Sequence, residues 1–229
     1  MTAFDLNTVD VDGAIRETED AVAGDTRSAF FRKAAIGGGA VLTSGAFMGM
    51  LPELAAARPS KKQDLQILNY ALTLEYLEAA FYKEAVDSGA LSGLVLDFAK
   101  IVNQDEQTHV TALRQTIKGL GGKPVAKPKF DFKGTNKESG KFLETAFVLE
   151  NTGVRAYLGQ VNRIKSNKIL AAAASIVTVE ARHSGAVAVL LNQSPFSGEK
   201  SISPSGAFDR ASSIRTILKE VGATGFIVS

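Results

Sequence analysis

Two short motifs contain the only histidines of this 229-residue chain, and each pairs a histidine with a glutamate three positions before it. The motifs are Glu106-x-x-His109 and Glu180-x-x-His183. Three residues of an α-helix turn through about 300°, so the carboxylate and the imidazole of each motif project from nearly the same face. Apolar residues occupy the rest of that face, and a carboxylate buried there is costly unless a positive group pairs with it. The spacing therefore predicts two metal-ligating helices; the alternative is a structural hydrogen bond between each histidine and its glutamate.

Two further glutamates, Glu75 and Glu150, lie in the middle of apolar helical stripes. A tyrosine follows each of them by seven positions: Tyr82 follows Glu75, and Tyr157 follows Glu150. Glu78 lies one turn after Glu75 and could replace it as a ligand, but Glu75 is favoured because the Glu150–Tyr157 pair shares its register. The tyrosines could donate hydrogen bonds to metal ligands or relay radicals, although tyrosines packed in a bundle are more often structural.

The two halves of the chain repeat each other. The spacing from Glu75 to Glu106 is 31 residues, and that from Glu150 to Glu180 is 30. Each half would form a helical hairpin, with a lone glutamate on its first helix and a Glu/His motif on its second. The sequence thus predicts an all-α, antiparallel four-helix bundle with a long crossover between helices 2 and 3, plus a short C-terminal helix. Hydrophobic periodicity and Gly/Pro breaks place the helices at 62–88, 91–119, 138–165, 167–192 and 208–221.

The segments between and after these helices are also distinct. Residues 121–137 are rich in Pro, Gly and Lys, which excludes a helix, and their length suits a crossover from one end of the bundle to the other. Phe130 and Phe132 are expected to hold this crossover against the bundle. The bundle itself is predicted to span 61–192, and 193–229 to form a C-terminal loop and short helix.

Four carboxylates and two imidazoles that converge inside such a bundle would hold two metal ions. Hard oxygen donors with one imidazole per metal suit iron or manganese better than zinc or copper(I). The chain has no cysteine, so thiolate ligands, disulfides and thiol catalysis are excluded. Asp105, next to Glu106, is expected to be solvated. The predicted ligands are Glu75, Glu106, His109, Glu150, Glu180 and His183.

These residues resemble those of ferritin-like proteins, in particular the exported branch known as ferritin-like-2 or desiccation-associated. The resemblance covers roughly residues 62–192, with further similarity in the Leu-Asn-Tyr-Ala-Leu-Thr-Leu-Glu-Tyr-Leu-Glu-Ala-Ala-Phe-Tyr segment (68–82) and in Pro-Lys-Phe-Asp-Phe (128–132). It implies a ferritin-like fold with one histidine per metal. It also implies terminal ligands at Glu75 and Glu180 and bridging ligands at Glu106 and Glu150.

The N-terminal segment is typical of an exported protein. Residues 1–25 contain seven acidic residues and one arginine, and this composition predicts disorder. Residues 26–60 combine a basic start, an uncharged Gly/Ala-rich run and an Ala-Ala-Ala stretch, so they are predicted to be a signal peptide or a membrane anchor. The basic start resembles a twin-arginine signal, except that Ser28 replaces the second arginine. Either alternative places the bundle outside the cytoplasm, in the periplasm or at the cell surface.

The sequence and the resemblance together favour an oxidoreductase in which two iron ions, or iron and manganese, react with dioxygen or peroxide. A first alternative is a stress- or desiccation-related structural or binding protein whose dimetal site only stabilises the bundle. A second is an oxygenase or desaturase-like enzyme with an organic substrate. Basic residues do not cluster with aromatic ones, so no nucleic-acid partner is expected. Contact with a membrane is expected only through a possible N-terminal anchor. Assembly into a homo-oligomer is compatible with the sequence.

Overall fold

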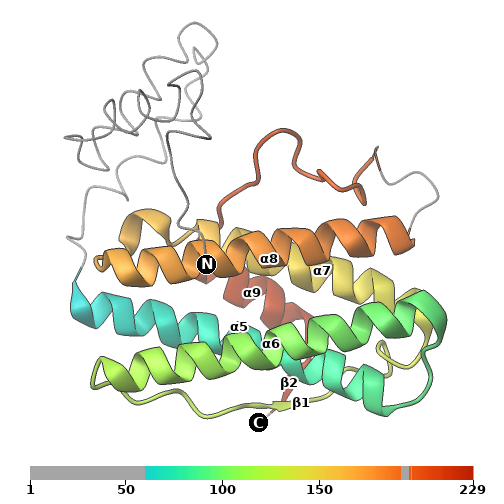
Figure 1. Cartoon of the computed structure of the whole chain (residues 1–229), viewed down its shortest axis with the longest axis horizontal. Helices are drawn as coiled ribbons and strands as arrows, with labels where there is room; N and C mark the ends of the chain where they lie inside the picture. Colours follow the sequence, from blue (N-terminus) through green and yellow to red (C-terminus); the bar gives the residue numbers. More distant parts are fainter. Residues whose placement is uncertain (1–59, 192–195, 197, 229) are drawn as a thin grey trace, which may run out of the picture. The chain divides into compact units, whose positions relative to one another are not determined.

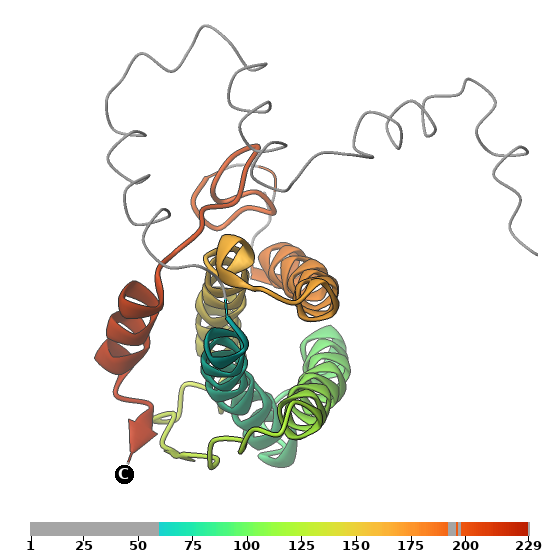
Figure 2. The same ribbon diagram turned by 90° about the vertical axis from the view of Figure 1, so that its left-hand side faces the viewer.

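Four long helices form the main body of the computed structural model, which describes residues 60–191, 196 and 198–228. Figure 1 shows them running alongside one another, and Figure 2 shows them end-on around a common axis. Helix α5 packs mainly against α6 and α7 mainly against α8, while α5 also meets α7 and α6 meets α8. The predicted all-α bundle of two hairpins is therefore confirmed. The predicted leader lies outside the described residues except for Ser60. The four helices are α5 (Lys61–Asp87), α6 (Gly93–Gly119), α7 (Ser139–Leu158) and α8 (Asn167–Leu191).

Polar side chains hold the backbone at the starts of α5 and α8. The hydroxyl of Ser60 accepts a hydrogen bond from the backbone N–H of Gln63 at 3.2 Å and so caps α5. The buried carboxylate of Asp64, in the first turn of α5, accepts the backbone N–H groups of Lys165 and Ser166 at 2.7 and 3.0 Å. Asp64 therefore satisfies donors just before α8 and joins the two hairpins at this end of the bundle.

The third helix is shorter than predicted: α7 ends at Leu158, whereas the prediction extended it to 165. A turn and a short 3-10 helix, η2 (Val161–Arg163), follow it. The backbone of Ser212 crosses at this point and donates a hydrogen bond to the carbonyl of Arg155 at 3.0 Å. A Cβ on Gly159 would lie only 1.8 Å from the carbonyl oxygen of Ser212, so only glycine permits this crossing. The C-terminal segment therefore ends the helix in a way that local periodicity does not reveal.

The C-terminal segment forms one short helix and one short strand. Helix α9 (Ile214–Thr224) replaces the helix predicted at 208–221; the hydroxyl of Ser213 caps its start, and Gly225 ends it in a left-handed conformation with φ 63°. Strand β2 (Ile227–Val228) then pairs antiparallel with β1 (Lys129–Phe130) of the crossover, a pairing that the sequence did not predict.

Aromatic side chains hold the crossover against the bundle, as predicted. Phe132 is buried in the main core cluster, with its ring 5.3 Å from Phe81 of α5 and 5.5 Å from Phe226 after α9. Phe130 is only partly buried and stacks on Phe132 at 5.8 Å between ring centroids. One aromatic cluster thus joins α5, the crossover and the C-terminal segment.

Helix α8 is unusually apolar for a helix that is only partly covered. Among the described residues it alone is long and apolar enough to cross a membrane, and about a third of its most apolar window is buried. Core helices of soluble proteins often have this character, and the inward face of α8 contains Glu180 and His183. Its composition therefore does not by itself indicate a membrane span.

Candidate metal centre

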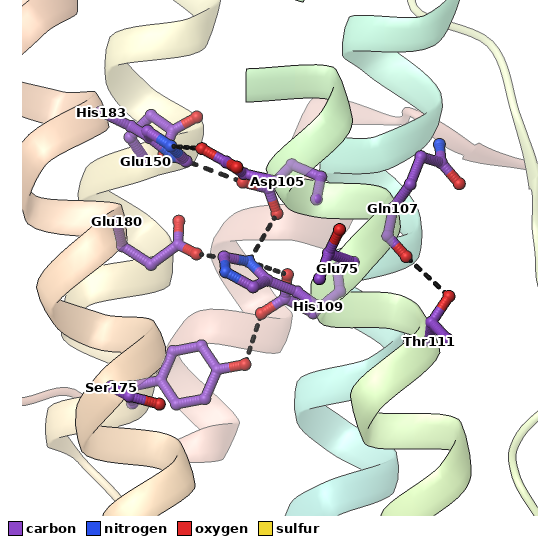
Figure 3. A network of polar contacts seen from close by, with 12 residues as sticks. Glu75, Asp105, Gln107, His109, Thr111, Glu150, Ser175, Glu180 and His183 are labelled. Atoms are coloured by element: carbon purple, nitrogen blue, oxygen red, sulfur yellow. Dashed lines mark hydrogen bonds and ion pairs between the residues drawn. The ribbon is translucent and has the colours of Figure 1, made fainter. Parts of the chain in front are cut away.

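All six predicted ligands come together inside the bundle, and Figure 3 shows five of them, Glu75, His109, Glu150, Glu180 and His183. Helices α5 and α7 each contribute one glutamate, while α6 and α8 each contribute a Glu/His motif. The four carboxylates are completely buried and the two imidazoles nearly so. Burial of this many ionisable groups is costly unless positive charge accompanies them. The residues are Glu75, Glu106, His109, Glu150, Glu180 and His183.

Three carboxylates surround one nitrogen of His109. Its Nδ1 lies 3.2 Å from Glu75 Oε2, 3.3 Å from Glu106 Oε2 and 3.2 Å from Glu180 Oε1. A ring N–H can donate one well-aligned hydrogen bond, so it cannot satisfy all three oxygens. Nitrogen and oxygen atoms that converge in this way are placed to share a cation.

His183 has a similar inward nitrogen and, in addition, an outer partner. Its Nδ1 lies 3.2 Å from Glu150 Oε2 and 3.3 Å from Glu106 Oε1, and its Nε2 lies 3.1 Å from Asp105 Oδ2. Asp105 is thus engaged rather than simply solvated, although 43% of its side chain is exposed. A proton on Nε2 that is donated to Asp105 leaves Nδ1 free to bind a metal, and the carboxylate increases the basicity of the ring.

The ligand atoms fall into two overlapping groups in which they lie within 4.8 Å of one another. Both groups contain Glu106 and Glu180. The first group also contains Glu75 and His109, and the second also contains Glu150 and His183. The shared pair is Glu106 and Glu180, because α6 and α8 meet across the bundle and their glutamates reach both groups. This differs from the roles that the resemblance implied, in which Glu150 would bridge and Glu180 would be terminal.

The shared glutamates also contain the carboxylate oxygens that lack hydrogen-bond donors. Glu106 Oε1 and both oxygens of Glu180 are buried and accept no hydrogen bond from the residues that the structure describes, although two of the three lie within ion-pair distance of a histidine. Buried acceptors of this kind are rare in folded proteins and call for an explanation. Two divalent cations would satisfy them, and a set of hard oxygens with one imidazole per ion fits iron or manganese.

The electrostatics show how the centre holds protons when no metal compensates its charge. Burial, followed by repulsion from Glu75, raises the pKa of Glu106 to about 8. Burial and repulsion from Glu106 also raise the pKa of Glu180 well above its usual range. Burial lowers the pKa of His183, but the nearby carboxylates of Glu106 and Glu150 outweigh burial and raise it to about 11. A metal ion that binds these side chains would therefore compete with protons for them.

Tyr82 and Tyr157 are each paired with a glutamate of the other half of the repeat. The hydroxyl of Tyr82 donates to Glu150 Oε1, and the hydroxyl of Tyr157 donates to Glu75 Oε1. The sequence places each tyrosine seven residues after a glutamate of its own helix, but in the structure its hydroxyl donates to the glutamate of the other half. Burial, followed by the charge of the accepting glutamate, raises the pKa of both hydroxyls well above its usual range, which keeps them as donors.

A fifth glutamate, Glu78, is buried beside the centre but belongs to neither ligand group. Its carboxylate makes no hydrogen bond within the described part of the chain, and burial, followed by repulsion from Glu180, raises its pKa well above the usual range. In the repeat its counterpart is Gly153, three positions after Glu150. A Cβ on Gly153 would lie 3.3 Å from Glu180 Oε2 and 3.4 Å from Glu78 Oε1. The glycine therefore leaves room for two carboxylates, and the structure groups Glu75 rather than Glu78 with the other candidate ligands.

Sequence reasoning missed the partner of His183 and the burial of Glu78. A signal for the first is a break in the repeat: Asp105 precedes Glu106, whereas Val179 precedes Glu180. A signal for the second is the change from Glu78 to Gly153 at equivalent positions. Differences between the halves of a repeat are therefore informative about the surroundings of the ligands.

The bundle and its centre define a class of protein: a four-helix bundle with a buried cluster of glutamates and histidines that could hold metal ions. A family model described as Ferritin-like domain matches residues 63–193, more than half of the chain, so the protein belongs to the ferritin-like domain family. No curated protein matches the chain significantly. The exported, desiccation-associated branch stays a prediction.

Proposed function

We propose that this protein binds two metal ions at the centre, iron or iron with manganese, and oxidises ferrous iron with dioxygen or peroxide. The observation that supports it best is the pair of overlapping ligand groups that share Glu106 and Glu180. Two divalent ions contribute four positive charges, which balance the four carboxylates of the groups. A centre neutral in this way is compatible with its complete burial.

The chemistry supplied by the metal is one-electron transfer from each of two ferrous ions. Dioxygen would accept the two electrons and two protons to give hydrogen peroxide; peroxide, as the oxidant, would accept two electrons and two protons to give two waters. The chain contributes ligand geometry and a dry environment. Tyr82 and Tyr157 orient the carboxylates of Glu150 and Glu75, and Asp105 orients the ring of the second histidine.

Metal content and ferrous oxidation of the full-length protein test this proposal. We expect the protein to bind two metal ions per chain. After anaerobic loading with ferrous iron, addition of dioxygen or peroxide should oxidise the bound iron. A Glu106→Ala/His183→Ala double variant should lose both. Glu144→Ala is a matched control, because Glu144 is exposed on α7, where it pairs with Lys200 at 3.0 Å.

The outcomes separate the alternatives. A folded wild type that binds neither iron nor manganese would refute the proposal. Bound metal without turnover would favour the structural or binding protein, and oxidation that requires an organic substrate would favour the oxygenase.

We also propose that the protein acts outside the cytoplasm, on the basis of the signal-like composition of residues 26–60. Fractionation of cells that produce the full chain, or a chain lacking residues 1–60, tests this. Export should require the segment; equal distribution of both chains would refute it.

A further inference from the structure

The end of the bundle at which α5 and α8 begin is strongly basic. It lies on the left in Figure 1 and faces the viewer in Figure 2. Three segments form it: 60–66 around the start of α5, 115–122 around the end of α6, and 159–170 around the start of α8. Together they contain one acidic residue, Asp64, and six basic residues. We call the six exposed side chains the basic end: Lys61, Lys62, Lys118, Arg163, Lys165 and Lys168.

Contacts between the three segments make the basic end one surface. The carboxylate of Asp64 in α5 accepts the backbone N–H of Lys165 at 2.7 Å, which joins the first segment to the third. A Cβ on Gly122 would lie only 2.5 Å from Leu65 Cδ2, so the chain after α6 passes closely over the first turn of α5. The apolar side chains beneath these contacts belong to, or pack against, one core cluster: Leu65, Ile117, Ile164 and Ile169.

The cations of the basic end have no anionic partner. None of the six forms an ion pair with another described residue, and Asp64 is buried and occupied by backbone N–H groups. Because like charges repel each other, such a concentration of unpaired cations indicates an anionic partner outside the bundle.

The opposite end of the bundle shows that this charge pattern is not general. Its segments, 81–97 and 131–141, contain four basic and five acidic residues. Three ion pairs join them: Lys83 with Asp87, Lys137 with Glu84, and Lys141 with Glu138. The excess of positive charge therefore belongs to one end of the molecule.

The composition of the basic end indicates what kind of anion it fits. Five of the six cations are lysines, which act as hydrated point charges rather than as planar forks that grip a single carboxylate or phosphate. The three segments contain no aromatic residue on which a nucleic-acid base could stack. A broad surface of lysines without aromatic side chains fits a broad surface of lipid phosphates, as basic segments beside membranes do.

The position of the basic end along the chain also favours a membrane. Residues 26–60, which are predicted to be a signal peptide or an anchor, end directly before Lys61. A retained anchor would hold the start of α5 close to a bilayer and would separate the acidic residues 1–25 from the bundle. A cleaved signal would instead leave a new α-amino group near this end, which adds positive charge.

We propose that the basic end binds the surface of an anionic lipid bilayer through the phosphates of the lipid headgroups. The metal ligands are not part of this surface, so the proposal does not depend on the iron chemistry. Each lysine or arginine close to such a bilayer strengthens binding by about fivefold. Salt weakens the attraction because it shortens the distance over which the charges act.

Binding of residues 57–229 to lipid vesicles tests the proposal without the leader. These residues form a compact unit by themselves, and both apolar core clusters lie within them. Sedimentation with vesicles made of equal parts of phosphatidylglycerol and phosphatidylcholine should show binding that weakens as salt is added. Vesicles of phosphatidylcholine alone should not bind. The triple variant Lys118→Gln/Lys165→Gln/Lys168→Gln should bind the anionic vesicles about a hundredfold more weakly.

The matched control is Lys83→Gln/Lys100→Gln/Lys141→Gln, which removes the same charge from exposed positions outside the basic end. Its affinity for the anionic vesicles should fall far less. If the first triple variant fails to fold, Lys165→Gln alone should still lose about fivefold.

Several results would overturn the proposal. They are equal binding to neutral and anionic vesicles, no binding to either, and equal losses in the two triple variants. Tighter binding of a duplex DNA oligonucleotide than of anionic vesicles would assign the basic end to nucleic acid. Displacement from the vesicles by an equimolar peptide of residues 1–25 would assign it to the acidic segment of the chain itself.

Discussion

Replacement of Asp105 by asparagine should weaken one metal position and leave the other unchanged. Asp105 Oδ2 lies 3.1 Å from Nε2 of His183, whereas His109 has no such carboxylate on its outer nitrogen among the described residues. Asp105→Asn keeps the size of the side chain but removes its charge. The imidazole of His183 then becomes less basic, and its metal position loses affinity.

The size of the expected loss of metal affinity follows from the solvent exposure of the Asp105–His183 pair. Loss of an outer partner of a metal-ligating histidine costs about 10- to 100-fold in affinity. Because 43% of the Asp105 side chain is exposed, solvent screens its charge and the lower end applies. We expect a loss of about tenfold, which corresponds to about 1.4 kcal/mol.

Variants that retain one histidine isolate each position. In a His109→Ala background, anaerobic titration with cobalt(II) reports the His183 position, and Asp105→Asn should lower its affinity about tenfold. In a His183→Ala background the same change should have no effect. Asp97→Asn, at an exposed position of the same helix, controls for the change in net charge. Equal losses in both backgrounds, or none in the first, would refute the role of Asp105 as a partner of His183.

Three further perturbations test the fold and the centre. Asp64→Ala removes a buried acceptor of two backbone N–H groups before α8 and should lower the free energy of unfolding by about 1–3 kcal/mol in urea titrations. In the metal-free protein the raised pKa values of Glu106, about 8, and His183, about 11, mean that the folded state binds more protons than the unfolded state. Its melting temperature should therefore fall as the pH rises from 5 to 9. Tyr157→Phe removes the donor to Glu75 and should weaken metal binding at the His109 position about tenfold, measured by titration in the single-position background.

Each of these expectations has a result that would contradict it. Unchanged stability of the Asp64 variant would show that water replaces the carboxylate at the start of α8. A melting temperature that rises with pH in the metal-free protein would contradict the proton-bound state of the buried carboxylates. Tyr82→Phe is the counterpart of the Tyr157 variant, because its hydroxyl donates to Glu150, and it should affect the His183 position instead. If both tyrosine variants weaken the same position, the exchange of partners between the halves is wrong.

Much of the fold and the set of candidate ligands could be predicted from the sequence. Local periodicity specifies which face of a helix is apolar, and a glutamate within that face must lie inside the bundle. The nearly equal spacing of the two halves, 31 and 30 residues, placed Glu75 and Glu150 at the same level as the Glu/His motifs. The structure brings all six residues together because these regularities are local properties of helices joined by short hairpins.

The helix ends and the strand pair were predicted less well, because contacts distant in sequence decide them. Helix α7 ends at Leu158 where the backbone of Ser212 crosses Gly159, and strands β1 and β2 pair residues that are about a hundred positions apart. Periodicity within one segment contains no information about which other segment will pack against it.

The sequence by itself determined which side chains face the interior; the tertiary structure alone decided how they are shared. The helices that adjoin each other make Glu106 and Glu180 common to both groups and give each tyrosine the glutamate of the opposite half. The same packing brings Asp105 to His183. The physical reason is that a helical pattern specifies the direction of a side chain, whereas its partners depend on which helices pack together and in what register.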